Sequence, residues 1–258
     1  MLRILLIALL LGGGPVVVRA ADVPTAQEMN NSNNPLTPAI GVNLQDQYVA
    51  SYYGLRNSDD TNSLLLRGVV PHRLFGWPQI IRATIPIATS MQEETGLGDI
   101  NVFDLFLFKA GPVALGAGPE MTFPSANDDA FGTGKWQAGA ALAVVAPQPW
   151  GLLGGLVTYQ HSFAGEERRL NQNNLVAQPV VIVNLPLAFY LRSSASWSFD
   201  LEHGDYFIPF GLGAGKIWKV GTGTTINVFA EPQYTVAHQG VAPHWQYFMG
   251  INLQFPLT

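Results

Sequence analysis

Residues 244–255 alternate between apolar and polar side chains, and this period of two limits the possible folds more than any other part of the chain. Successive residues of a strand point to opposite faces, so the segment is a strand with one apolar face. That face has aromatic residues at both ends and aliphatic residues between them, as lipid-facing strands do. Its members are Trp245, Tyr247, Met249, Ile251, Leu253 and Phe255.

The same alternation recurs along the chain and predicts twelve strands. With 27 glycines and 18 prolines, the composition also argues against a helical bundle. No segment after the N-terminus is apolar for the roughly 18 residues that a membrane helix needs, so a closed barrel is the remaining way to satisfy backbone groups in lipid. The predicted strands are 40–52, 62–70, 81–87, 100–109, 113–123, 136–145, 151–163, 175–184, 189–199, 206–215, 226–236 and 245–255.

Connections between these strands alternate in length, as expected for bacterial barrels with short periplasmic turns and longer external loops. The longer ones are predicted at 53–61, 88–99, 124–135, 164–174, 200–205 and 237–244. The short ones are 110–112, 146–149, 184–186 and 219–223, and 71–78 is longer than this pattern requires. We therefore predict an all-β fold: a transmembrane antiparallel up-and-down β-barrel of about 12 strands over residues 40–258, with both termini periplasmic.

The N-terminus has the features of a secretory signal peptide. Arg3 precedes an apolar stretch at 4–11, and Val18-Arg19-Ala20 places small residues for cleavage before Ala21. We therefore predict a cleaved signal peptide at 1–20 and localisation to the bacterial outer membrane. Residues 21–39 form a polar leader rich in asparagine and proline, which is either a flexible linker or a plug of the lumen.

Composition excludes several functions. The chain has no cysteine, which removes thiolate nucleophiles and cysteine-based zinc or iron–sulfur sites. Its formal charge of −5 gives no electrostatic basis for binding nucleic acid. No sequence pattern implies a cofactor.

Two segments conflict with the simple alternation. Asp46 lies on the apolar parity of the first strand, where a carboxylate in lipid is costly, and this implies a bulge or a shifted boundary. In 100–108 both parities are largely apolar. We expect Phe103, Leu105 and Leu107 to face outward, because the opposite choice sends Asp104 into lipid.

Polar residues on the inward parity are the candidates for lining a transport path: Arg82, Glu120, Asn227, Glu231 and Gln233. Arg82 is expected to pair with Glu120 or Glu231 across the barrel, either as a structural pair or to narrow the path. Phe207, Phe229 and Phe248 share that parity with several glycines. Such a lining suits an apolar solute, or it is packing that closes the bore.

No catalytic or metal-binding residues are predicted. Ser162 lies beside His161 and close to Glu166 and Glu167, but neighbouring strand residues face opposite sides, so a polar strand end is favoured over a rim lipid hydrolase. Acidic residues gather in the long loops. Solvation explains them, and the alternative is divalent cations shared with lipopolysaccharide phosphates.

Several motifs, in order along about 36–258, resemble the bacterial outer-membrane barrel family labelled after the MetA pathway of phenol degradation. The resemblance implies an outer-membrane channel or transporter for aromatic or other hydrophobic compounds. It carries over no catalytic or ligand residues, because the family has no agreed set. The motifs are Thr95-Gly96-Leu97-Gly98-Asp99-Ile100-Asn101, Gly118-Pro119-Glu120-Met121-Thr122-Phe123-Pro124, Asp128-Asp129, Gly132-Thr133-Gly134-Lys135-Trp136, Ser162-Phe163-Ala164-Gly165, Gly211-Leu212-Gly213-Ala214-Gly215-Lys216 and Gln254-Phe255-Pro256.

Three functional hypotheses follow. The leading one is a channel or transporter for small, hydrophobic or aromatic compounds by passive diffusion, with no enzymatic activity. The second is a structural or surface-interaction barrel that binds lipopolysaccharide or a partner without transport, and the third is the rim hydrolase. The expected partners are outer-membrane lipid, lipopolysaccharide and a small-molecule solute.

Overall fold

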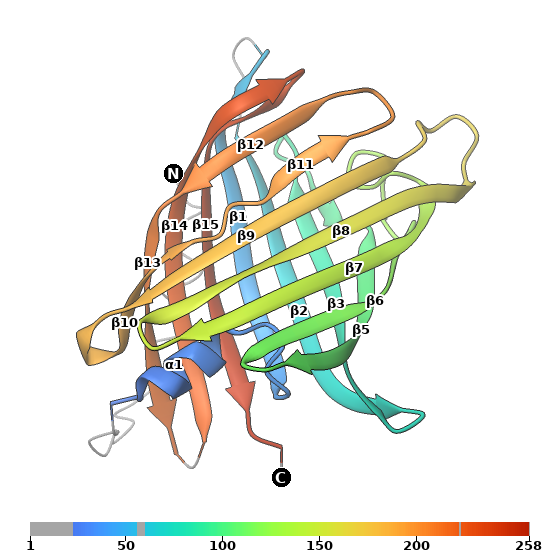
Figure 1. The fold of residues 1–258 in the computed structure, drawn as a ribbon. Helices are drawn as coiled ribbons and strands as arrows, with labels where there is room; N and C mark the ends of the chain where they lie inside the picture. The colour runs from blue at the N-terminus through green and yellow to red at the C-terminus, as the bar shows by residue number, and fades with distance from the viewer. Residues whose placement is uncertain (1–22, 56–59, 222, 258) are drawn as a thin grey trace.

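The strands form one antiparallel sheet that closes on itself through pairing of the first strand, β1, with the last, β15 (Figure 1). The computed structural model describes residues 23–55, 60–221 and 223–257. The predicted signal peptide, 1–20, lies outside the described residues. The elements are α1 (Ala26–Asn33), β1 (Ile40–Tyr53), β2 (Thr61–Leu74), β3 (Trp77–Thr89), β4 (Thr95–Leu97), β5 (Ile100–Ala110), β6 (Val113–Phe123), β7 (Lys135–Gln148), β8 (Gly151–Gly165), β9 (Asn173–Asn184), η2 (Pro186–Ala188), β10 (Phe189–Ser193), β11 (Trp197–Asp200), β12 (Tyr206–Gly211), β13 (Gly213–Val220), β14 (Thr224–Gln239) and β15 (Ala242–Phe255).

The closed barrel has 12 strands, as the alternation predicts. β10 and β11 are two pieces of one strand, since both pair with β9. β12 and β13 are likewise two pieces of the next strand, both paired with β14. The short β4 pairs with β3 beyond the point where β5 does, so β4 and β5 are also pieces of one strand. The all-β, antiparallel barrel prediction is therefore confirmed.

The outside of the barrel is apolar. Large apolar side chains are exposed on alternate strand positions, for example Leu142 and Val144 on β7 and Trp245 and Tyr247 on β15. A continuous apolar exterior of this kind is the lipid-facing surface of a transmembrane barrel. Aromatic side chains gather near both ends of the strands: Trp77, Phe108, Trp150, Phe189 and Trp218 at one end, and Trp136, Phe163, Trp197, Tyr234 and Trp245 at the other.

Two turns are shorter than predicted. β2 and β3 continue through the prolines of the expected 71–78 connection, and only Phe75 and Gly76 remain between them. Both have positive φ, 51° and 83°, which matches the twist of a two-residue hairpin. The predicted long connection at 237–244 is also wrong, because β14 ends at Gln239 and β15 begins at Ala242. Period-two patterns become weak near strand ends, where both faces are polar.

The predicted orientation of the 100–108 strand is wrong. Phe103 and Leu105 are buried inside the barrel, and Asp104 is on the outward face. There, His72 Nε2 lies 3.0 Å from Asp104 Oδ1, and the Gln79 amide, oriented with Nε2 toward the carboxylate, donates to Asp104 Oδ2 at 2.7 Å. These partners on β2 and β3 supply the hydrogen bonds that the Asp104 carboxylate needs, and they cannot be recognised from the sequence around Asp104.

Asp46 also keeps its outward parity. The pairing of β1 with β15 runs without a shift from Ile40 to Val49, so the bulge expected near Asp46 is absent from this part of the strand. The register shifts occur later, between Val49 and Tyr52. The carboxylate is half-buried between neighbouring strands.

The leader enters the barrel at the end where the short turns lie, called the short-turn end here; the opposite end is the long-loop end (Figure 1). Helix α1 begins with a capping box: Thr25 Oγ1 accepts from the Glu28 backbone N–H, and the Glu28 carboxylate accepts from the Thr25 N–H. Among the described residues, no helix is long and apolar enough to cross a membrane.

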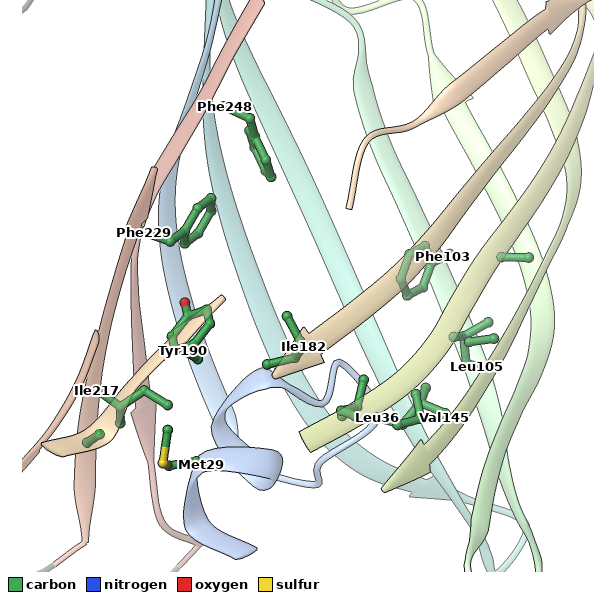
Figure 2. Packing of buried hydrophobic residues seen from close by; sticks show 14 residues of the cluster. Met29, Leu36, Phe103, Leu105, Val145, Ile182, Tyr190, Ile217, Phe229 and Phe248 are labelled. Atoms are coloured by element: carbon green, nitrogen blue, oxygen red, sulfur yellow. The ribbon is translucent and has the colours of Figure 1, made fainter. Parts of the chain in front are cut away.

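Met29 and Leu36 of the leader pack into the apolar cluster on the inner wall, near Ile217 and Val145 (Figure 2). The leader is therefore seated inside one end of the barrel. Whether the segment 23–39 acts as a linker or as a plug, which the sequence left open, stays a prediction.

Candidate functional site

Two cavities lie along the inside of the barrel and share part of their lining. The leader-side chamber, of about 170 Å³, is lined by Ser32, Asn33, Asn34 and Pro35 of the leader and by inward residues of several strands. The outer chamber, of about 150 Å³, is lined by residues closer to the long-loop end, among them Gln47 and Thr158. The residues that line both cavities lie between them and are called the constriction here: Arg67, Arg82, Gln178, Ser194 and Phe248.

Arginine side chains at this level lie against aromatic rings. The Arg82 guanidinium carbon is 4.0 Å from the centroid of the Phe103 ring. On the other side of the lumen, the Arg192 guanidinium carbon is 3.7 Å from the centroid of the Phe229 ring and 5.5 Å from that of the Phe248 ring. Figure 2 shows Phe103 across the bore from Phe229 and Phe248. The narrow part of the lumen thus combines cationic groups with phenyl faces.

Glu231 is the most engaged polar side chain of the lumen. It has no exposed surface, and its carboxylate accepts from Arg192 Nε at 2.8 Å, from the Ser194 backbone N–H at 2.8 Å and from Ser194 Oγ at 2.7 Å. Gln233 Nε2 donates to it at 3.1 Å. Gly211 leaves the space that this carboxylate occupies, because a Cβ there would lie 2.2 Å from Glu231 Oε1.

These contacts continue as a belt of amides across neighbouring strands. Gln246 Nε2 donates to Gln233 Oε1 at 2.8 Å, and Gln47 Nε2 donates to Gln246 Oε1 at 3.0 Å. The belt joins β14, β15 and β1 to the interruption between β10 and β11. Such a satisfied network fixes the shape of one side of the lumen.

Asn227 attaches the leader to the wall. Its amide donates to Asn33 Oδ1 at 3.0 Å and to Ser32, and its Oδ1 accepts from the Tyr190 hydroxyl at 2.5 Å. Lys219 adds an ion pair, with Nζ 2.6 Å from Glu28 Oε1. This hydrogen bond from Lys219, followed by that from the Thr25 N–H, lowers the pKa of Glu28.

The five predicted lumen candidates all face the barrel interior. Arg82 lines both chambers, while Glu120 and Gln233 line the outer one. The expected contact ion pair of Arg82 is not formed among the described residues: Glu231 pairs with Arg192, and Glu120 Oε1 accepts from Asn101. Glu120 still acts on Arg82 electrostatically at longer range. Which inward charges meet depends on strand stagger around the barrel, which the sequence does not give.

Sequence reasoning missed Arg67 and Arg192 as lumen residues. Arg67 lies on β2 opposite in parity to Leu64 and Leu66, and its Nη1 donates to Gln45 Oε1. Arg192 shares the parity of Tyr190 and Ser194, opposite to Leu191. The same period-two signal that selected Arg82 was available for both.

The residues weighed for hydrolysis are separated. His161 is exposed on the outer face, whereas Ser162 is buried and its Oγ accepts from the Gln172 backbone N–H at 3.0 Å. In the described part of the chain, no group of three or more histidine and acidic side chains is placed to hold a metal ion. In the long loops, Asp129 pairs with Arg168 and Asp200 with His203.

The arrangement defines a class: a closed transmembrane barrel with a partly filled lumen and a segment seated in one end. The structure resembles the COG4313 outer membrane channel from Pseudomonas putida F1, with a TM-score of 0.62 and 12% identity over 86% of this chain and 99% of that one. It also resembles the NanC porin, with a TM-score of 0.52 and 10% identity over 85% of this chain and 100% of that one. A third similar structure is the KdgM porin in complex with disordered oligogalacturonate, with a TM-score of 0.51 and 10% identity over 84% of this chain and 99% of that one.

At such low identity these likenesses show the fold, which is that of outer-membrane channel barrels. No family model matches the chain, and no curated protein matches it. The resemblance to the MetA-pathway family therefore stays a prediction.

Proposed function

We propose that this protein is an outer-membrane channel through which small apolar or aromatic compounds diffuse passively, without enzymatic activity. The observation that carries the proposal is the pair of chambers along the barrel axis, joined at a constriction of arginines and phenyl rings. The fold shared with outer-membrane channels supports it.

The direction of passage follows from the loops. Short turns of bacterial barrels are periplasmic, so the long-loop end would face outside. A solute entering there reaches the outer chamber, passes Arg82, Phe103 and Phe248, and arrives at the leader-side chamber. Phenyl faces favour an apolar body at each step, and contact of the external loops with lipopolysaccharide remains part of the proposal.

The leader is proposed as the gate. It is held by the Asn227 hydrogen bonds, by the Glu28–Lys219 ion pair and by burial of Met29 and Leu36. Asn30 also bonds to Gln148 and Asn184, and Gln254 donates to the Ser32 carbonyl. All these contacts belong to one short segment, so its release costs less than unfolding the barrel. Its displacement would connect the leader-side chamber with the periplasm.

Reconstitution tests the proposal. Solute flux and single-channel conductance are compared for the intact mature protein, for a variant lacking residues 23–38, and for a variant carrying Arg82→Ala and Glu120→Ala. Vesicles with lipopolysaccharide in the outer leaflet slow the unassisted entry of apolar solutes. We expect higher conductance and flux without the leader, and altered solute preference in the double variant. Absence of flux for every solute, with and without the leader, would favour a structural or surface-interaction barrel instead.

A further inference from the structure

The charges that line the leader-side chamber are all of one sign. Among its described lining residues are Arg67, Arg82 and Arg192, and none is aspartate or glutamate. Arg192 is neutralised by Glu231, whose carboxylate points to the interruption of the wall. Arg67 and Arg82 have no carboxylate in direct contact in the described part of the chain, although Glu120 acts on Arg82 electrostatically at longer range. Glu120, the nearest acidic candidate, lines only the outer chamber.

Both of these arginines have donors left over. Within the described residues, Nε of Arg67 and Nε of Arg82 are buried and have no hydrogen-bond acceptor. Arg67 donates to Gln45, and Arg82 lies against the Phe103 ring and interacts with Glu120 only electrostatically, without a hydrogen bond between them. A buried guanidinium with unused donors is costly, and the cost is removed by an acceptor that enters the chamber.

The two arginines are placed to act on one ligand. In the β2–β3 ladder Arg67 pairs with Thr84 and Val69 pairs with Arg82, so the two are diagonal neighbours on the inward face. Diagonal positions of this kind are roughly 7–8 Å apart, within reach of long side chains. Two adjacent guanidiniums repel each other, and an anion bound between them offsets this repulsion because it attracts both.

Part of the remaining lining is apolar. Phe103 and Phe248 lie on opposite sides of the bore, and Val69, Ile80, Val180 and Ile182 also line the chamber. The other lining side chains are mostly uncharged amides and hydroxyls, such as Asn43, Gln178 and Asn252. A fully hydrated inorganic anion gains nothing from the apolar surfaces. A ligand that carries one carboxylate on a flat or aliphatic body matches both parts of the chamber.

We infer that the leader-side chamber is a binding site for small amphipathic monoanions of the aromatic carboxylate class, with the carboxylate between Arg67 and Arg82 and the ring between Phe103 and Phe248. This rests on the proposed channel function and names the solute class that the constriction selects. The leader closes the chamber at the short-turn end, so release of the bound acid to the periplasm requires the leader to move.

The test uses the intact mature protein in detergent micelles and the fluorine signals of 4-fluorobenzoate and the uncharged 4-fluorobenzamide. We expect the benzoate to bind more tightly than the amide. Arg67→Gln and Arg82→Gln should each weaken benzoate binding about tenfold, since each removes a charge-assisted hydrogen bond, and should leave the amide unchanged. Arg82→Lys keeps the charge, so its affinity for benzoate should lie between those of the wild type and Arg82→Gln. Arg73→Gln, on the exposed β2–β3 hairpin, is the matched control.

Equal binding of acid and amide by the wild type overturns the inference, as does benzoate binding that both Gln variants retain. Displacement by acetate as effective as displacement by benzoate overturns the role of the apolar wall. A folded barrel in each variant is verified by its resistance to unfolding in cold detergent. Selective binding without any transmembrane flux would refute the channel and leave the site standing, whereas flux without selective binding would refute the site alone.

Discussion

Glu231 on β14 and Arg192 on β10 form an ion pair inside the barrel, with 2.8 Å between Oε2 and Nε, although the strand made of β12 and β13 lies between them. Glu231 reaches over the glycines of that strand to the Ser194 N–H on the far side. The pair therefore closes the inner side of the wall where the ladder between β10 and β11 is interrupted.

Glu231→Gln should destabilise the barrel by about 3–5 kcal/mol, because it leaves the Arg192 guanidinium buried without its counter-charge. The measurement is the free energy of unfolding in urea with the protein in lipid vesicles, followed by tryptophan fluorescence. Glu202→Gln, in the exposed loop after β11, serves as the control and should change little. A loss below about 1 kcal/mol for Glu231→Gln would show that solvent or another group compensates Arg192.

Gly215→Val should loosen the leader through Tyr190. A Cβ at Gly215 would lie 2.3 Å from the Tyr190 hydroxyl, and that hydroxyl holds Asn227, which in turn holds Ser32 and Asn33. Displacing the ring should cost about 1–3 kcal/mol of stability and expose the leader to proteolysis. The rate of leader cleavage in intact vesicles is the readout.

Gly68→Val is the matched control for this substitution. Gly68 is an outward glycine of β2, and an added Cβ meets nothing within 4 Å. If both variants leave the leader equally protected, Tyr190 does not transmit wall packing to the leader.

The sequence predicted the strand number and the inward position of Glu231 because both follow from a local period of two. The prediction from sequence failed at Asp104, because both faces of that strand are largely apolar and the hydrogen-bond partners of the carboxylate were not known. Those partners, His72 and Gln79, come from other strands, and their meeting depends on register. The ion pairing of Arg82 failed for the same reason, since stagger around the barrel is not a local property.

The leader was only partly predictable. Thr25 and Glu28 have the spacing of a capping box, which is a local signal for the start of α1. Among the residues that hold the helix in place, Lys219 and Asn227 lie about 190 residues away in sequence. Composition showed a polar segment, but its docking depends on contacts that only the closed barrel creates.

Docking of the leader should weaken in acid. The hydrogen bond from Lys219 lowers the pKa of Glu28 below its ordinary value of 4.5. A lowered pKa in the docked state means that the interaction is fully present above the ordinary value and is lost as pH falls through the lowered one. Because both side chains are partly exposed, the effect should stay below about 1 kcal/mol.

Channel conductance at pH 7 and below pH 4.5 measures this effect. The wild type should open more often in acid, and Glu28→Gln should show the higher open probability already at pH 7. Glu167→Gln, in a loop at the long-loop end, is the control for general charge effects. A Glu28→Gln variant that keeps the wild-type response to acid would assign the pH dependence to another group.

The outward cluster of His72, Gln79 and Asp104 should respond differently to single and combined substitutions. The Gln79 side chain is 1% exposed, so Asp104→Leu leaves its amide buried without an acceptor and should cost about 1–3 kcal/mol. Replacing all three by leucine removes every polar group at once and should restore stability to near the wild-type value, or exceed it. Urea unfolding in lipid vesicles compares the four proteins, adding His72→Leu as the second single variant. A triple variant at least as unstable as Asp104→Leu and His72→Leu added together would contradict this account of the cluster. The outward carboxylate would then contribute more than a satisfied polar group facing lipid.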